Sequence, residues 1–114
     1  MTNDLSSLGK TSTGIQPNVA GLLCYLGGFI TGIIFVAIEK ENKFVRFHAM
    51  QSLVVFGFFT VLGMVAVFIP VVGWSALPVI YVLEFILWIV LMIKAYHGQT
   101  LKLPIAGDIA EKNS

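Results

Sequence analysis

Charge is what this sequence has least of. Only 11% of its 114 residues are charged and 57% are hydrophobic, whereas soluble domains carry about 25% charged residues. No Asp, Glu, Lys or Arg occurs between residues 11 and 38, and Glu84 is the only one between residues 47 and 93. A soluble domain needs charged faces for water, while a bilayer requires that they be absent. The sequence therefore predicts an integral membrane protein.

Other scarcities exclude several classes of function. A single cysteine, Cys24, cannot form an intrachain disulfide or a cysteine metal cage. No Gly-rich phosphate loop follows a strand pattern, and no nucleophile–base pair is evident. His48 and His97 could bind haem or a metal, but nothing supplies a further ligand. The basic residues are too few for a nucleic-acid surface. We expect a non-enzymatic protein with no cofactor, metal or nucleic-acid partner.

Three apolar stretches approach the length needed to cross a bilayer core about 30 Å thick, which takes roughly 20 residues. They predict helices at residues 19–38, 47–69 and 76–96, within a transmembrane domain of residues 17–97. Residues 1–16 are expected to be a flexible polar tail. Residues 98–114 are expected to be a cytoplasmic tail, either an amphipathic helix or a flexible segment. The predicted fold class is an all-α three-helix membrane bundle.

The distribution of basic residues predicts how the chain is oriented. An odd number of spans places the two termini on opposite sides of the membrane. One side then holds the first loop and the C-terminal tail, with six of the seven Lys and Arg residues: Lys40, Lys43, Arg46, Lys94, Lys102 and Lys112. The other side has only Lys10. Because basic residues stay in the cytoplasm, we expect a protein of the cell membrane with the N-terminus outside and the C-terminus inside.

Glu84 is the first candidate functional residue. It follows Trp74 by ten residues, which places it about 15 Å deep, near the bilayer midplane. Acids inside the membrane often belong to ion, proton or substrate paths. Alternatively, a neutral Glu84 only joins the helices by hydrogen-bonding Thr31, Thr60 or a backbone carbonyl. The sequence leaves both interpretations open.

A polar stripe at the start of the second predicted helix is the next candidate site. His48, Gln51 and Ser52 share one helical face and enter the membrane beneath Arg46. Arg46 can hold anionic lipid headgroups. The stripe either lines a wet cavity or joins helix ends, with Tyr96 or His97 as partners.

Small residues share one face of the first predicted helix. Gly21, Gly28 and Gly32 are spaced by four or seven, and the last two form a G-x-x-x-G pair. Such faces let helices pack closely in lipid. Three helices enclose too little space for a wide pore, so conduction would require association. Besides the lipid bilayer, we therefore expect a second copy or another membrane protein as a partner.

Three segments carry a resemblance to a known family. They are GLLCYLGG at residues 21–28, EKENKFVRFHAMQS at 39–52 and KLPIAGDIA at 102–110. They resemble small prokaryotic membrane proteins grouped with the Tic-type chloroplast import subunit. The plastid relatives belong to the inner-envelope preprotein translocon. In this sequence the shared motif residues, which have no agreed role, are Phe44, Arg46, Phe47, His48 and Gln51.

The resemblance implies a multi-pass helical membrane protein that acts as a translocation or transport component. The plastid protein is usually drawn with four spans, whereas this sequence supports three. The alternative function is a structural or assembly subunit of a larger membrane complex, which the small size and the absence of soluble domains favour.

Overall fold

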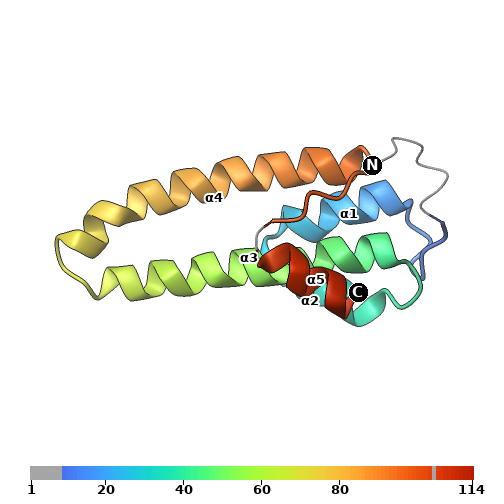
Figure 1. Ribbon diagram of the computed structural model, residues 1–114, viewed down its shortest axis with the longest axis horizontal. Helices are drawn as coiled ribbons and strands as arrows, with labels where there is room; N and C mark the ends of the chain where they lie inside the picture. Colours follow the sequence, from blue (N-terminus) through green and yellow to red (C-terminus); the bar gives the residue numbers. More distant parts are fainter. Residues whose placement is uncertain (1–8, 104) are drawn as a thin grey trace.

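Every regular element in the described part of the chain is a helix. The computed structural model describes residues 9–103 and 105–114. It contains α1 (Pro17–Leu26), α2 (Phe29–Ile38), α3 (Lys43–Val67), α4 (Val72–Tyr96) and α5 (Ala106–Asn113). The molecule measures 50 × 25 × 21 Å. In Figure 1, α3 and α4 run along its length, and α1, α2 and α5 lie beside one half of them. We call this crowded half the head, and residues 57–86, which form the other half, the hairpin.

The first predicted span is two helices rather than one. The predicted helix at residues 19–38 is interrupted at Gly27 and Gly28, where α1 ends and α2 begins. Gly28 has φ +63° and ψ −138°, a conformation that only glycine adopts readily. The Thr31 hydroxyl accepts a hydrogen bond from the Gly27 N–H and donates one to Cys24 O, which satisfies backbone groups freed by the break. The predicted three-helix bundle is therefore wrong in this element.

After the break the chain reverses direction. The N–H of Ser12 donates to the Glu39 carboxylate at 2.8 Å, so the segment before α1 meets the residue after α2. Asn18, at the start of α1, donates to the carbonyl of Tyr96 at the end of α4. A single straight helix over residues 19–38 would separate its ends by about 30 Å. The described parts near both termini thus lie at the same end of the molecule, not at opposite ends as the three-span prediction required.

The two long helices form an antiparallel pair. α3 and α4 are long and apolar enough to cross a membrane, whereas α1 and α2 are shorter apolar helices. The Asn42 side chain caps α3 by accepting a hydrogen bond from the N–H of Val45. Where the pair turns, Gly73 lies so close to the carbonyl of Ala66 that no larger residue fits. α4 begins four residues earlier than predicted, which leaves Pro78 inside it rather than in its first turn.

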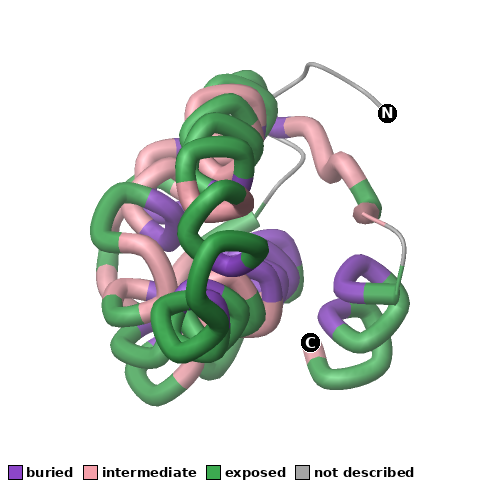
Figure 2. Tube along the Cα trace, turned by 90° about the vertical axis from the view of Figure 1, so that its left-hand side faces the viewer, coloured by how far each residue is buried: buried purple, intermediate pink, exposed green. Residues whose placement is uncertain are grey.

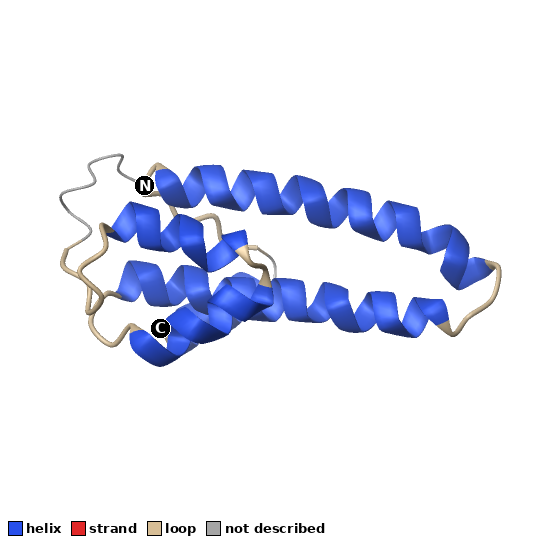
Figure 3. Ribbon diagram, turned by 180° about the vertical axis from the view of Figure 1, so that it is seen from behind, coloured by secondary structure: helices blue, strands red, loops and turns tan. Residues whose placement is uncertain are grey.

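The C-terminal segment packs against α3. From Gln99 to Leu103 the chain runs beside α3, and α5 then returns toward the end of the head (Figure 3). The exposed Lys102 pairs with Asp108 at 3.3 Å and with Glu111 at 3.1 Å across this turn. An amphipathic helix was one of the two predicted alternatives for the tail. Pro104 and residues 1–8 of the predicted N-terminal tail lie outside the described residues.

Burial is concentrated in the head. Tyr25, His48 and Leu91 are among the largest side chains with no exposed surface. Figure 2 shows exposed backbone along the hairpin, which faces the viewer, and buried segments behind it. Large apolar side chains of the hairpin are widely exposed, for example Phe58 at 62% and Phe85 at 60%. A hairpin of this kind requires a lipid or protein environment.

Candidate functional site

Glu84 lines a groove where the hairpin meets the head. The groove, of about 410 Å³, is lined by Leu26, Gly27, Gly28, Phe29, Phe56, Thr60, Tyr81, Glu84, Phe85 and Trp88. We call it the Glu84 groove. A second hollow of about 240 Å³ shares Thr60, Tyr81 and Glu84 with it and continues past Gly63. The break between α1 and α2 thus lies beside the one acid on the two long helices.

The structure does not pair Glu84 with either predicted threonine. Thr60 donates its hydroxyl to the carbonyl of Phe56 at 2.7 Å, one turn back in its own helix. The Thr31 hydroxyl instead hydrogen-bonds backbone groups of Gly27 and Cys24 at the break between α1 and α2. Within the described residues, no hydrogen bond or ion pair reaches the half-buried Glu84 carboxyl. The interpretation in which Glu84 only joins helices within one chain therefore lacks a partner group.

The predicted polar stripe forms a buried hydrogen-bonded group, which we call the His48 cluster (Tyr25, His48 and Gln51). The amide of Gln51 donates to the Tyr25 hydroxyl at 3.1 Å. That hydroxyl lies 2.6 Å from Nδ1 of His48, and Nε2 of His48 lies 3.0 Å from the carbonyl of Gln99. Because the Gln99 carbonyl can only accept, Nε2–H of His48 donates to it, which leaves Nδ1 to accept the Tyr25 proton. His48 is held as one neutral tautomer with both nitrogens occupied.

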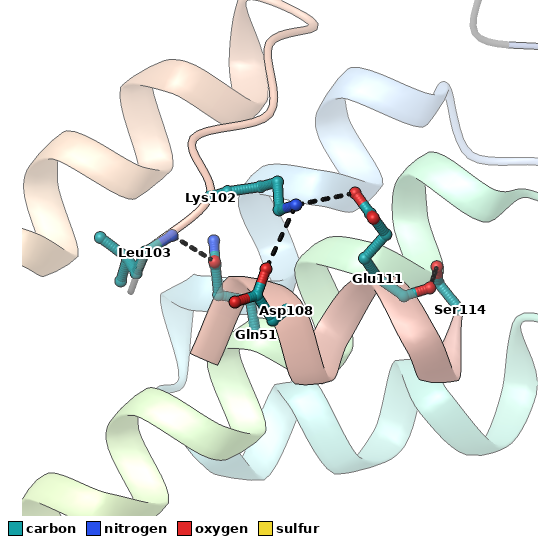
Figure 4. Close-up of polar contacts among 6 residues, drawn as sticks. All are labelled: Gln51, Lys102, Leu103, Asp108, Glu111 and Ser114. Carbon is teal, nitrogen blue, oxygen red and sulfur yellow. Dashed lines mark hydrogen bonds and ion pairs between the residues drawn. The ribbon is translucent and has the colours of Figure 1, made fainter. Parts of the chain in front are cut away.

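Gln51 also fixes the C-terminal segment. Its amide donates a second hydrogen bond to the carbonyl of Leu101 at 2.9 Å. Its side-chain oxygen accepts one from the N–H of Leu103 at 3.1 Å, which Figure 4 shows. The stripe therefore joins α3 to α1 and to residues 99–103. It does not join α3 to Tyr96 or His97, the partners expected from the sequence.

Arg46 lies at the end of α2. It is half-buried and donates to the carbonyls of Glu39 at 2.6 Å and Val36 at 3.3 Å, both left open where that helix ends. Its Nε also approaches the terminal carbonyl of Ser114 at 3.4 Å. The guanidinium thus caps a helix within the protein, whereas the sequence indicated a contact with lipid headgroups.

Glu39 holds the loops of the head together. One carboxylate oxygen accepts hydrogen bonds from the backbone N–H groups of Ser12, Glu41 and Asn42 at 2.8–3.1 Å. The other, Oε1, is buried with no hydrogen-bond partner among the described residues. Burial raises the pKa of Glu39, but the hydrogen bonds outweigh it and the net pKa is lowered.

Two further residues of the site were not indicated by the sequence. Tyr25 and Trp88 sit in apolar runs and resemble core aromatic residues. In the structure, the indole N–H of Trp88 donates to the carbonyl of Tyr25 at 2.7 Å, and Ser52 donates to the carbonyl of Gly28 at 2.8 Å. The tip of the α1–α2 pair is therefore attached to both long helices. Among the features of the sequence, only the Gly27-Gly28 pair indicated a helix break, whose open backbone carbonyls would need hydrogen-bond donors such as these.

Comparison with known proteins identifies relatives along nearly the whole chain. Residues 12–110 match the model of the MamF/MmsF family, described as the magnetosome magnetite crystal formation protein family. A UPF0132 membrane protein of Methanocaldococcus jannaschii is 53% identical over 107 residues, covering 94% of this chain and 96% of that protein. Another, from Archaeoglobus fulgidus, is 49% identical over 98 residues, covering 86% and 95%.

No solved structure matches this chain. No relation to the Tic-type import subunit is shown by these matches. Their extent and identity place the protein among membrane proteins, and its own two long apolar helices are candidate spans. The chain belongs to the MamF/MmsF family, together with the archaeal UPF0132 membrane proteins.

Proposed function

We propose that this chain is a non-enzymatic subunit of a larger membrane assembly, with the Glu84 groove as its contact surface. The observation that carries the proposal is the Glu84 carboxyl, which has no partner in the described chain and opens into a groove of mixed aromatic, aliphatic and polar lining. Lipid chains offer no hydrogen bonds, so a polar group at this depth gains most from a neighbouring helix. Tyr81, with 58% of its surface exposed, borders the same groove.

The proposal includes a membrane placement. α3 and α4 cross the bilayer, α1 and α2 enter it and return, and the N-terminal segment, the loop after α2 and the C-terminal segment share the cytoplasmic side. The seven basic residues then all belong to the head side: Lys10, Lys40, Lys43, Arg46, Lys94, Lys102 and Lys112. The turn between α3 and α4, at residues 68–71, carries none, as the positive-inside rule requires.

Site-directed cross-linking tests the contact surface. Phe85 lines the groove and is 60% exposed, while Leu83, 51% exposed, lies on nearly the opposite side of α4. In a Cys24→Ala background, we expect Phe85→Cys to give cross-linked products in native membranes and Leu83→Cys to give much less. A product of twice the chain mass indicates a second copy, and any other mass indicates a different membrane protein. Equal yields from the two positions would refute the groove as the contact.

Glu84 itself is tested in the same background. Glu84→Leu should reduce the Phe85→Cys cross-link severalfold, because a hydrogen bond between membrane helices is worth about 1 kcal/mol. Glu84→Gln should retain most of it, since an amide still offers hydrogen bonds. An unchanged cross-link in Glu84→Leu would remove Glu84 from the contact.

A translocation or transport component is the second candidate. The observation that favours it is the interrupted α1–α2 element beside Glu84, since broken helices often form substrate sites in transporters. Purified protein in planar bilayers should then give a conductance that Glu84→Gln abolishes. If cross-linked assemblies show no conductance, the transport role is rejected and the role as an assembly subunit remains.

Magnetite crystal formation, the role in the family's description, is not carried over to this chain. Among the residues that the structure describes, no three His, Cys, Asp or Glu side chains come together as metal ligands would. The proposal therefore rests on the groove and on the membrane placement.

A further inference from the structure

The two halves of the molecule differ greatly in the number of helices they contain. Figures 1 and 3 show α1 and α2 beside α3 and α4 in the head, with α5 against α3, whereas the hairpin consists of α3 and α4 only. Each helix occupies a cylinder about 10 Å across. The head is therefore much wider than the hairpin in the plane of the membrane.

The inserted pair α1–α2 reaches only about half of the bilayer. α2 contains ten residues, which span about 15 Å, against a bilayer core of about 30 Å. Ile30, Ile33, Ile34 and Ile38 are 47–58% exposed along it, so α2 must face lipid. Its neighbours Glu39 and Lys40 mark the membrane surface at one end. The tip at Gly28, held by Ser52, lies near the midplane at the other.

The C-terminal segment adds width at the surface of the same half. α5 exposes Ile109 on one side, and Asp108, Glu111 and Lys112 are also exposed. Ile105, just before α5, is 75% exposed. A short helix with both apolar and charged exposed side chains suits the headgroup level. The leaflet that holds the head thus accommodates four helices and part of a fifth, while the opposite leaflet accommodates two.

We propose that this protein is a membrane wedge that favours curved bilayers, with the head in the leaflet on the convex side. Unequal cross-sections in the two leaflets relieve packing stress where the wider half lies in the expanded leaflet. The inference rests on the proposed membrane placement but not on assembly through the Glu84 groove. Its ligand is the lipid surface itself, and no additional partner is needed.

Sorting between flat and tubular membrane tests the wedge. The full chain, labelled at its C-terminus, is reconstituted into giant vesicles of phosphatidylcholine with a minority of phosphatidylglycerol, and a narrow tether is pulled from them. An external quencher distinguishes molecules with the head outward from those with the head inward. We expect the outward population to be enriched in the tether about twofold or more, and the inward population to be depleted. Equal density in tether and vesicle for both orientations would overturn the proposal.

A variant pair separates the wedge from general effects of substitution. Gly27→Leu with Gly28→Leu favours one continuous helix over residues 19–38, which would cross both leaflets and remove the asymmetry. Gly57→Leu is the control, because a side-chain atom added there meets nothing within 4 Å. Sorting should vanish in the first variant and persist in the control. Persistent sorting in a folded double variant that retains its helical circular dichroism would argue against the wedge.

The outcome of the sorting experiment does not depend on the proposed assembly through the Glu84 groove. Cross-linking at Phe85 can succeed while sorting is absent, which would reject the wedge alone. Sorting with no cross-link would reject the Glu84 contact alone. Failure of the protein to float with vesicles would reject the membrane placement that both proposals share.

Discussion

At the scale of single residues, Tyr25 holds the interior of the head together. Its hydroxyl accepts from Gln51 and donates to His48, and its carbonyl accepts from Trp88. α1, α3 and α4 therefore meet at one residue. The spacing of His48 and Gln51 on a helix predicted that they act together. Tyr25, which joins them, lies in α1, and the sequence did not show that the chain reverses after this helix.

Removal of the Tyr25 hydroxyl gives the first prediction. In Tyr25→Phe, Nδ1 of His48 loses its donor and a Gln51 N–H loses its acceptor, both in the buried interior. We expect the free energy of unfolding to fall by about 1–3 kcal/mol. Titration with a denaturing detergent, followed by tryptophan fluorescence, measures it. Tyr96→Phe, at a residue 49% exposed, is the control and should change little. An unaltered midpoint in Tyr25→Phe would contradict the role assigned to the hydroxyl.

Glu39 gives the second prediction, which concerns pH. Its pKa in the folded protein is lowered by the N–H groups of Ser12, Asn42 and Glu41, which outweigh the opposing effect of burial. Its stabilising effect is therefore complete above the unfolded pKa of about 4.3 and is lost as pH falls through the lower folded value. We expect the stability of the wild type to drop over this acidic range and that of Glu39→Gln to drop less. Thermal unfolding in detergent at several pH values provides the comparison, and parallel profiles would contradict it.

At the scale of elements, the close packing of α2 on α3 depends on Gly32. A Cβ atom there would lie 2.8 Å from the carbonyl oxygen of Ala49 and 3.0 Å from the nitrogen of Leu53, both backbone atoms that cannot yield cheaply. Gly28, its partner in the G-x-x-x-G pair, instead forms the break before α2. The motif thus combines a packing surface with a reversal of the chain.

The third prediction concerns the replacement of Gly32 by alanine. Gly32→Ala should lower the free energy of unfolding by about 1–3 kcal/mol, because it overpacks the α2–α3 contact. Gly57→Ala, in open space on α3, should be neutral or stabilise by up to about 1 kcal/mol through helix propensity. The same detergent titration compares the two variants. Equal effects at both glycines would mean that the close contact does not limit stability.

At the scale of the whole molecule, the termini provide the fourth prediction. The Ser12–Glu39 and Asn18–Tyr96 hydrogen bonds bring the described segments near both ends of the chain to the head. We expect a fluorescent reporter that matures only in the cytoplasm to be bright when fused to either terminus. A periplasmic phosphatase reporter should be inactive at both. Signals on opposite sides for the two fusions would restore the three-span orientation predicted from the sequence.

The sequence by itself determined the environment and the long elements. Two runs of apolar residues can exist only where water is excluded, and their lengths define α3 and α4 to within a few residues of the prediction. Glu84 was singled out for the same reason, since one acid in such a run stands out without any knowledge of its neighbours. These inferences depend on composition and length alone.

Only the tertiary structure decided that residues 17–38 turn back. A continuous apolar run of about 20 residues satisfies the length rule whether it is straight or broken. The break is held because Thr31, Ser52 and Trp88 donate hydrogen bonds to backbone carbonyls around it. Two of these donors come from other helices, so local sequence could not reveal them. The direction of the chain, the shared position of the described segments near its ends and the unequal width of its halves all follow from that reversal.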